Sequence, residues 1–136
     1  MPPFFDTNVL VYFVDADEPE KQEISRRLVR EHLAEGDGTI SVQVLREFFW
    51  SSRRLRTPVS YETASEAVEY FAKFSPLQED ASMVLEAVRR SRKMSISFWD
   101  ALIVEAALKV GADRLFTEDM QHGQVIEGMR VENPFL

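Results

Sequence analysis

Four carboxylic acids lie in segments of the sequence that are otherwise strongly apolar, and acids placed this way can do metal chemistry. Burying an unpaired carboxylate costs several kcal/mol, so each acid needs a partner in the folded protein. If the four share one crevice, their mutual repulsion favours a hard divalent cation, and oxygen-only ligands suit Mg²⁺ or Mn²⁺ better than zinc. The four acids are Asp6, Glu47, Asp100 and Asp119.

Three of these positions also have ordinary structural explanations. Asp6 could form an Asx-turn or cap a helix. Asp100 could close a capping box with Ser97, because Ser-x-x-Asp before an apolar run is the signature of that motif. Asp119, or its neighbour Glu118, could cap the turn that follows a strand.

Glu47 has an equally simple alternative, since beside Arg46 it could face water. No single acid therefore establishes a site. The prediction rests on the combination of the four and on the elements that would position them.

Those elements are expected to alternate between strand and helix along the chain. Alternation of this kind predicts a central parallel sheet with helices on both faces, a three-layer α/β/α, Rossmann-like fold. Ligands of such sheets bind beyond the carboxyl ends of the strands, where Asp6 and Asp119 fall. We expect strands at 3–5, 39–40, 74–77 and 114–116 with an edge strand within 128–135, and helices at 9–13, 20–35, 42–49, 61–73, 80–92 and 98–108.

The apolar pattern also predicts how the helices pack. The segment 98–108 is apolar on nearly all sides, which indicates a buried helix. In the helix at 80–92, we expect Val84, Leu85 and Val88 to face the core. His32 lies on a polar helix and is expected to be exposed.

Length and composition narrow the possible functions. A chain of 136 residues is expected to form a single domain spanning 1–136. It has no cysteine, which excludes disulfides, zinc thiolates and a cysteine nucleophile, and with no evident signal peptide or membrane span we expect a cytoplasmic protein. The net charge of −7 argues against nucleic-acid binding, although arginines cluster within 26–30, 53–56 and 89–93 and could contact phosphates or simply face water.

Taken together, four segments resemble the PIN-domain family, in the same order along nearly the whole chain. The segments are FDTNVL at 5–10, SVQVLREF at 41–48, WDALI at 99–103 and LFTED at 115–119. The small size and the ending TEDMQHG at 117–123 look most like the VapC-type toxin branch. One departure is that Met120 and Gln121 follow the last acid where many members have an aromatic residue, which leaves Glu118 as a rival to Asp119.

This resemblance implies an endoribonuclease, the toxin of a type II toxin–antitoxin pair, that hydrolyses RNA with one or two Mg²⁺ or Mn²⁺ ions. It implies a cognate antitoxin as partner, and a homodimer. It also implies that the four acids are the metal-binding and catalytic residues. The supporting hydrogen-bonding residues would be Thr7, Asn8 and Thr117.

An acidic site held by an antitoxin also predicts an apolar groove beside it, near Phe48, Phe49 and Trp50. Trp50, Phe49 and Tyr61 could alternatively stack RNA bases or belong to the core.

Two other functions remain open at this point. A haloacid-dehalogenase-type phosphatase also places an Asp after its first strand, but it needs a second Asp where this chain has Asn8, and Lys109 lies far along a buried helix. A non-catalytic PIN-like module that binds RNA or protein is the other, although such a module is expected to have lost some of the four acids.

Overall fold

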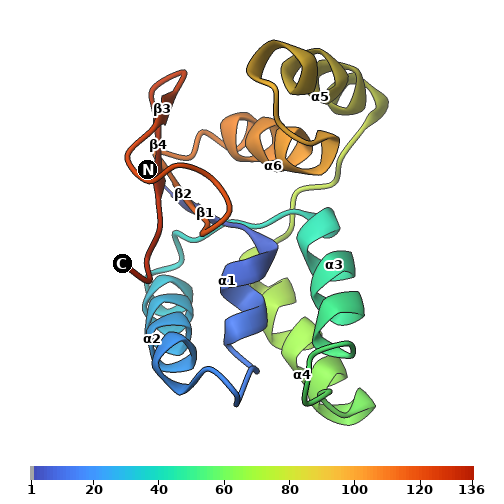
Figure 1. Cartoon of the computed structure of the whole chain (residues 1–136), viewed down its shortest axis with the longest axis vertical. Helices are drawn as coiled ribbons and strands as arrows, with labels where there is room; N and C mark the ends of the chain where they lie inside the picture. Colours follow the sequence, from blue (N-terminus) through green and yellow to red (C-terminus); the bar gives the residue numbers. More distant parts are fainter. Residues whose placement is uncertain (1) are drawn as a thin grey trace.

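A computed structural model describes residues 2–136, and in it short strands alternate with helices as expected (Figure 1). None of the helices in this range is both long and apolar enough to cross a membrane. The elements are β1 (Pro3–Phe5), α1 (Thr7–Tyr12), α2 (Pro19–Glu35), α3 (Val42–Ser52), α4 (Tyr61–Phe71), the 3₁₀ turn η1 (Ala72–Phe74), α5 (Ala81–Met94), α6 (Phe98–Lys109), β2 (Arg114–Phe116), β3 (Val125–Ile126) and β4 (Met129–Glu132).

The sheet has the order β1-β2-β4-β3, with β1, β2 and β4 parallel and β3 antiparallel to β4. The prediction that the tail adds one edge strand was therefore wrong in detail: the tail forms a hairpin, and its second strand inserts beside β2. The strands expected at 39–40 and 74–77 are reduced to single bridges, Thr39 with Phe4 and Leu77 with Ser41.

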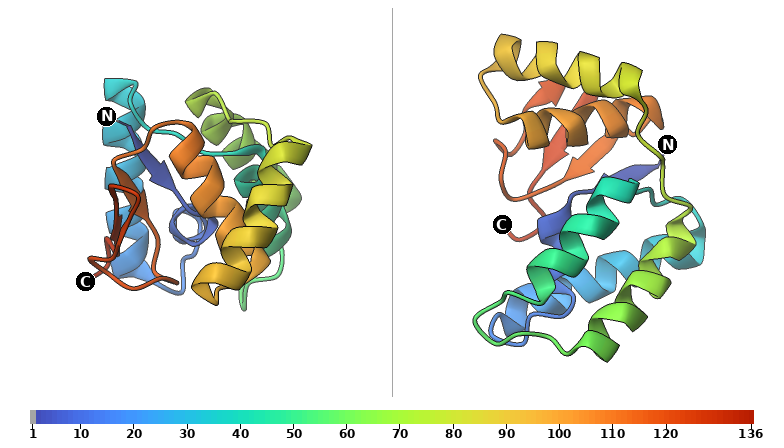
Figure 2. Two further views of the ribbon diagram at one scale, coloured as in Figure 1. Left: turned by 90° about the horizontal axis from the view of Figure 1, so that it is seen from above. Right: turned by 90° about the vertical axis from the view of Figure 1, so that its right-hand side faces the viewer.

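The three layers are clear when the molecule is seen from above (Figure 2, left). The sheet lies between α2 on one side and α6 on the other, and α5 covers the outer side of α6. Of the remaining helices, α1 begins at the carboxyl end of β1, and α3 and α4 follow α2 in the chain (Figure 1). The predicted α/β/α architecture with a mostly parallel central sheet is thus present.

The core is rich in phenylalanine. Phe4 and Phe5 of β1 and Phe116 of β2 are fully buried or nearly so, together with Phe48 of α3 and Phe71 of α4. The helix α6 is buried along most of its length, as its apolar sequence predicted. This packing fixes the carboxyl ends of β1 and β2 side by side, since Phe5 pairs with Phe116.

The prediction for α5 was wrong. Val84, Leu85 and Val88 are exposed, and the buried residues are Met83 and Ala87. The helix carries apolar residues on two adjoining faces, and only one of them meets α6. Larger aliphatic residues are usually inside, but the outermost helix has only one covered face.

His32 was expected at the surface and is instead buried, with 8% of its surface exposed. The buried residues of α2 are Ser25, Val29 and His32. The imidazole lies edge-on to Phe5, and its Nδ1 is 2.7 Å from Asp37 Oδ1. A polar helix thus presents its only histidine inward because that side chain has a carboxylate partner.

Gly38 leads into the crossover and leaves no room for a side chain. A Cβ atom at this position would lie 2.5 Å from Phe74 Cε1 and 3.0 Å from Phe5 Cε2. We expect Gly38→Ala to lower the free energy of unfolding by about 1–3 kcal/mol, the usual cost of overpacking. Urea denaturation measures this, and the double variant Gly38→Ala/Phe74→Leu should recover part of the loss; an unchanged stability in Gly38→Ala would contradict the prediction.

Candidate active site

Asp6 is the residue at which β1 ends and α1 begins. It is the N-cap of α1, and its Oδ1 accepts a hydrogen bond from the backbone N–H of Thr7 at 2.7 Å. Its Oδ2 accepts a hydrogen bond from the hydroxyl of Thr117 at 2.8 Å. The capping role considered from the sequence is therefore real, but it does not explain the burial, since only 5% of Asp6 is exposed.

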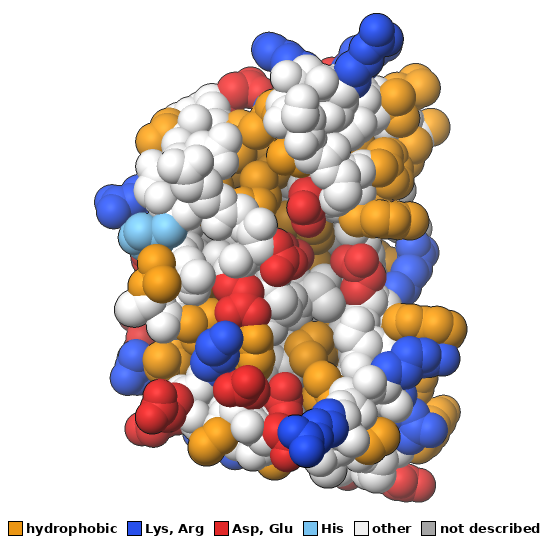
Figure 3. Space-filling model, in the orientation of Figure 1, with side chains coloured by type: hydrophobic (Ala, Val, Ile, Leu, Met, Phe, Trp, Pro, Cys, Tyr) orange, Lys and Arg blue, Asp and Glu red, His pale blue; other side chains and the backbone are white. Residues whose placement is uncertain are grey.

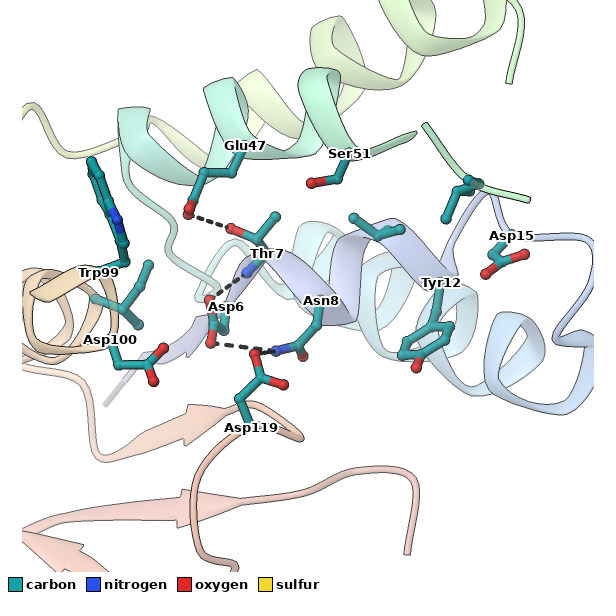
Figure 4. Close-up of a pocket in the computed structure, with 13 residues that line it drawn as sticks. Asp6, Thr7, Asn8, Tyr12, Asp15, Glu47, Ser51, Trp99, Asp100 and Asp119 are labelled. Carbon is teal, nitrogen blue, oxygen red and sulfur yellow. Dashed lines mark hydrogen bonds between the residues drawn. The ribbon is translucent and has the colours of Figure 1, made fainter. Parts of the chain in front are cut away.

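Two further acids converge on Asp6. Asp100 stands in the first turn of α6, and its backbone N–H donates to the hydroxyl of Ser97, as the capping motif predicted. Asp119 follows β2. One carboxylate oxygen from each of the three acids lies within 4.8 Å of the other two, and the side chains point toward one another (Figure 4). We call Asp6, Asp100 and Asp119 the acid cluster.

Asn8 bridges two members of this cluster. Its Nδ2 donates to Asp119 Oδ2 at 2.9 Å and lies 3.4 Å from Asp6 Oδ2 and 3.2 Å from Thr117 Oγ1. The backbone N–H of Asp119 in turn donates to Thr117 Oγ1. Asn8 and Thr117 therefore set the positions of two carboxylates, and the structure places both where supporting residues were predicted.

Glu47 lines the same pocket but stands outside the acid cluster. It comes from α3, and its Oε1 accepts hydrogen bonds from the hydroxyl of Thr7 at 3.0 Å and from Gln43 Nε2 at 3.1 Å. Thr7 thus connects Glu47 to the same turn that carries Asp6 (Figure 4). The structure brings Glu47 to the site without bringing it within direct reach of the three other acids.

Glu118 points to other partners. Tyr12 donates its hydroxyl proton to Glu118 Oε1, and Lys21 Nζ lies 3.1 Å from Glu118 Oε2. The Lys21 ammonium also lies 4.8 Å from the centre of the Tyr12 ring. Two neighbouring carboxylates are thereby separated, with Asp119 in the acid cluster and Glu118 in an ion pair beside it.

The acid cluster perturbs the proton affinity of its members. Burial raises the pKa of the Asp6 carboxyl from 3.8 to about 7, with smaller upward contributions from the charges of Asp119 and Asp100 and opposing hydrogen bonds from Thr117 and Thr7. Burial also raises the pKa of Asp100, with a further contribution from Asp119. Carboxylates packed this closely therefore resist ionising together.

The cluster opens into a pocket of about 370 Å³ at the carboxyl ends of β1 and β2. Acidic side chains gather in the hollow that crosses this face of the molecule, and basic side chains lie nearer its edges (Figure 3). The donor set consists of carboxylate oxygens converging on one point, which fits Mg²⁺ or Mn²⁺ and lacks the nitrogen or sulfur ligands typical of zinc.

Two of the basic clusters singled out in the sequence are partly engaged within the protein. Arg90 forms ion pairs with Glu105 and Glu127, so it joins α5 and α6 to the β3–β4 turn. Arg26 donates its Nε–H to the backbone carbonyl of Phe13. Both guanidinium groups are thus partly committed to contacts within the protein.

The groove predicted near Phe48, Phe49 and Trp50 is present in altered form. Phe48 is fully buried and belongs to the core, so its prediction as a groove residue was wrong. Phe49 is half-buried and packs edge-on against Tyr61, whereas 63% of Trp50 is exposed. Phe48 follows Val44 by one helical turn on the core face of α3, and the sequence alone does not separate that face from the next one.

Sequence reasoning missed two residues of the site. Gln43 is buried, and its Nε2 connects Glu47 to the backbone carbonyl of Trp99. Trp99 lines the pocket beside Asp100. The available signals were a glutamine one helical turn before Glu47 and a tryptophan adjoining Asp100, neither of which is specific.

The family assignment follows from comparison with known proteins. The PIN domain matches residues 4–126, which include all four acids. The chain belongs to the PIN-domain family. Among curated proteins no match was found.

A solved structure similar to this PIN-domain protein is VapBC2 from Rickettsia felis bound to a DNA fragment from their promoter, with a TM-score of 0.66, 18% identity and 98% of each chain covered. At that identity the likeness supports the fold. Family membership and the hydrogen-bonded Asn8, which takes the position of the second catalytic Asp, leave no support for a haloacid-dehalogenase-type phosphatase.

Proposed function

We propose that this PIN-domain protein is a divalent-metal-dependent endoribonuclease. The observation that carries the proposal is the convergence of Asp6, Asp100 and Asp119 within 4.8 Å of one another, at the sheet edge where α/β proteins bind ligands. PIN-domain membership supports the reaction class. Asp6, Asp100, Asp119 and Glu47 are the proposed catalytic and metal-binding residues.

The position of each acid indicates its proposed role. Asp6, Asp100 and Asp119 hold one or two Mg²⁺ or Mn²⁺ ions, and Glu47 reaches the same pocket from α3 to orient a water molecule. When bound, the cation supplies positive charge that acidifies water and stabilises the leaving oxygen. Thr7, Asn8 and Thr117 keep the carboxylates in place through hydrogen bonds, which narrows the geometry that the acids can adopt.

The proposal is tested by incubating the purified protein with total RNA and Mg²⁺ or Mn²⁺, with EDTA as the metal-free control. We expect discrete cleavage products with either metal and none with EDTA. Asp100→Asn should abolish the products, whereas Asp17→Asn, a change in an exposed loop, should not. Binding of RNA without cleavage by any of these proteins would instead indicate the non-catalytic module.

The choice between Asp119 and Glu118 has its own test. We expect Mn²⁺ to raise the melting temperature, corresponding to about 2.7 kcal/mol at a concentration 100 times the dissociation constant. Asp119→Asn should remove most of that increment, because it withdraws an oxygen ligand from the cluster. Glu118→Gln weakens the Lys21 ion pair but should preserve the increment; the opposite ranking in differential scanning fluorimetry would assign the ligand to Glu118.

We propose further that the protein is the toxin of a toxin–antitoxin pair in the cytoplasm, with a cognate antitoxin and a second copy of itself as partners. The similar fold of the VapBC2 structure supports this. Induced expression should arrest growth, and the Asp100→Asn variant expressed to the same level should not. If the parent protein and the Asp100→Asn variant both arrest growth, the toxicity does not come from the proposed nuclease.

A further inference from the structure

Both tryptophans of the chain are exposed, and both line one groove. Trp50 lies on α3 with 63% of its surface exposed, and Trp99 lies on α6 with 60% exposed. They line a groove of about 660 Å³ between α3 and the start of α6. Single exposed apolar residues are common, but apolar surface gathered in one concave site often marks a binding surface.

The groove is continuous with the acid pocket. Trp99, Glu47 and Ser51 line both spaces. Trp99 and Asp100 are successive residues in the first turn of α6, and their side chains diverge, with Asp100 directed to the acid cluster and Trp99 toward α3 (Figure 4). A ligand whose reacting group sits at the acid cluster therefore has its next unit beside the Trp99 indole.

The groove carries charges of both signs, with positive charge placed against Trp50. Arg46 lines the groove and is exposed. The Arg54 guanidinium carbon lies 3.1 Å from the centre of the Trp50 ring, and its Nη1 donates to the backbone carbonyl of Trp50, so a positive charge covers one face of the ring and leaves the other for a base. Glu79 also lines the groove, but one of its carboxylate oxygens accepts the backbone N–H of Gln43.

We propose that Trp99 and Trp50 are the base-stacking residues of this groove, with Trp99 on the base next to the scissile phosphate and Trp50 on a base farther along a single-stranded RNA. The proposal rests on the proposed nuclease function and names two side chains that would bind its substrate. Every base has a flat π-face, so such stacking tolerates any sequence. It requires an unstacked base, which a duplex does not offer, so cleavage selects unpaired strands and loops.

Base stacking quenches indole fluorescence, and the groove holds both tryptophans of the chain, so the emission reports on this surface directly. Asp6→Asn protein in Mg²⁺ is titrated with a twelve-nucleotide oligouridine, with the same oligomer carrying abasic sites, and with a duplex of equal length. We expect quenching by the first only. Trp99→Ala should raise the dissociation constant about 5- to 100-fold, the effect of losing one stacked base, and Trp99→Phe should restore most of it.

Tyr61→Ala is the matched control, because Tyr61 is 60% exposed and lies outside the groove. In the otherwise unaltered enzyme, Trp99→Ala should raise KM for single-stranded RNA more than it lowers kcat. Equal binding of the abasic oligomer, or Trp99→Ala and Trp50→Ala binding like their parent, would overturn the proposal. So would sedimentation showing that the tryptophans instead join two copies of the chain and are shielded from RNA.

Loss of the stacking groove and loss of the nuclease would give different results. If Trp99→Ala and Trp50→Ala leave metal-dependent cleavage unchanged, the nuclease proposal stands and the stacking proposal is wrong. If quenching depends on Trp99 but no metal supports cleavage, the stacking proposal stands and the nuclease proposal is wrong.

Discussion

We expect the Asp6→Asn variant to lose metal-dependent RNA cleavage and, without metal at pH 8, to be more stable than the parent protein. Cleavage should fall about 10³-fold or more, because a metal site contributes several kcal/mol of charge stabilisation in the transition state. The stability change has the opposite sign because asparagine keeps the shape of Asp6 without its buried charge.

The dependence on pH follows from the raised pKa. Asp6 has a pKa of about 7 in the folded protein, against 3.8 for the free side chain. The stability supplied by the protonated form is full below about pH 4 and is lost as pH rises through about 7, a loss of up to about 4 kcal/mol. In EDTA, the advantage of Asp6→Asn measured by urea denaturation should therefore grow between pH 5 and pH 8.

Mn²⁺ should reverse that ranking, because it binds the carboxylate form and not the amide. If Asp6→Asn is less stable than the parent by a constant amount at every pH, burial does not disfavour the charged form of Asp6. The acid cluster would then be an ordinary hydrogen-bonded turn.

The second large effect is expected at Asn8, whose side-chain N–H groups face three oxygen atoms of Asp6, Thr117 and Asp119. Asn8→Asp keeps the shape but replaces the donors with a charge of the same sign as its neighbours. We expect activity to fall about 10- to 100-fold, the usual effect of losing a residue that orients metal ligands. Steady-state cleavage of one RNA substrate with increasing Mn²⁺ measures this.

Asn8→Ala is the matched comparison. It removes the same donors without adding charge, so the metal-free Asn8→Asp protein should melt below Asn8→Ala, and Mn²⁺ should narrow the gap. Equal melting temperatures with and without metal would indicate that Asn8 only fills space.

The sequence was sufficient for the strand ends and insufficient for the helix faces. Asp6 and Asp119 each follow a short apolar run, and the rule for parallel sheets brings such positions together whatever the details of the strands. Asp100 was recognisable for a similar reason. A charged side chain in the first turn of an almost uniformly apolar helix must reach a polar site at the end of that helix.

The errors share a physical cause. Val84, Leu85 and Val88 were assigned inward, and Phe48 was assigned to a groove, because neighbouring faces of a helix carry similar residues and only tertiary packing decides between them. His32 was assigned to the surface, yet its imidazole is buried because the contact with Asp37 offsets the cost of burying a polar ring. Local pattern indicates which segments are amphipathic, but it does not indicate which partner covers them.

The origin of the acid cluster has a consequence for synthesis. Asn8 and Asp119, which are hydrogen-bonded to each other, are 111 positions apart, and β2 lies between β1 and β4 in the sheet. Contacts so distant in sequence slow folding, because a long loop must close before they form. A growing chain on the ribosome carries Asp6 and Glu47 long before Asp119 emerges, so the acid cluster cannot assemble until residue 119 has been made. A chain cut short before β2 should therefore lack a complete acid cluster.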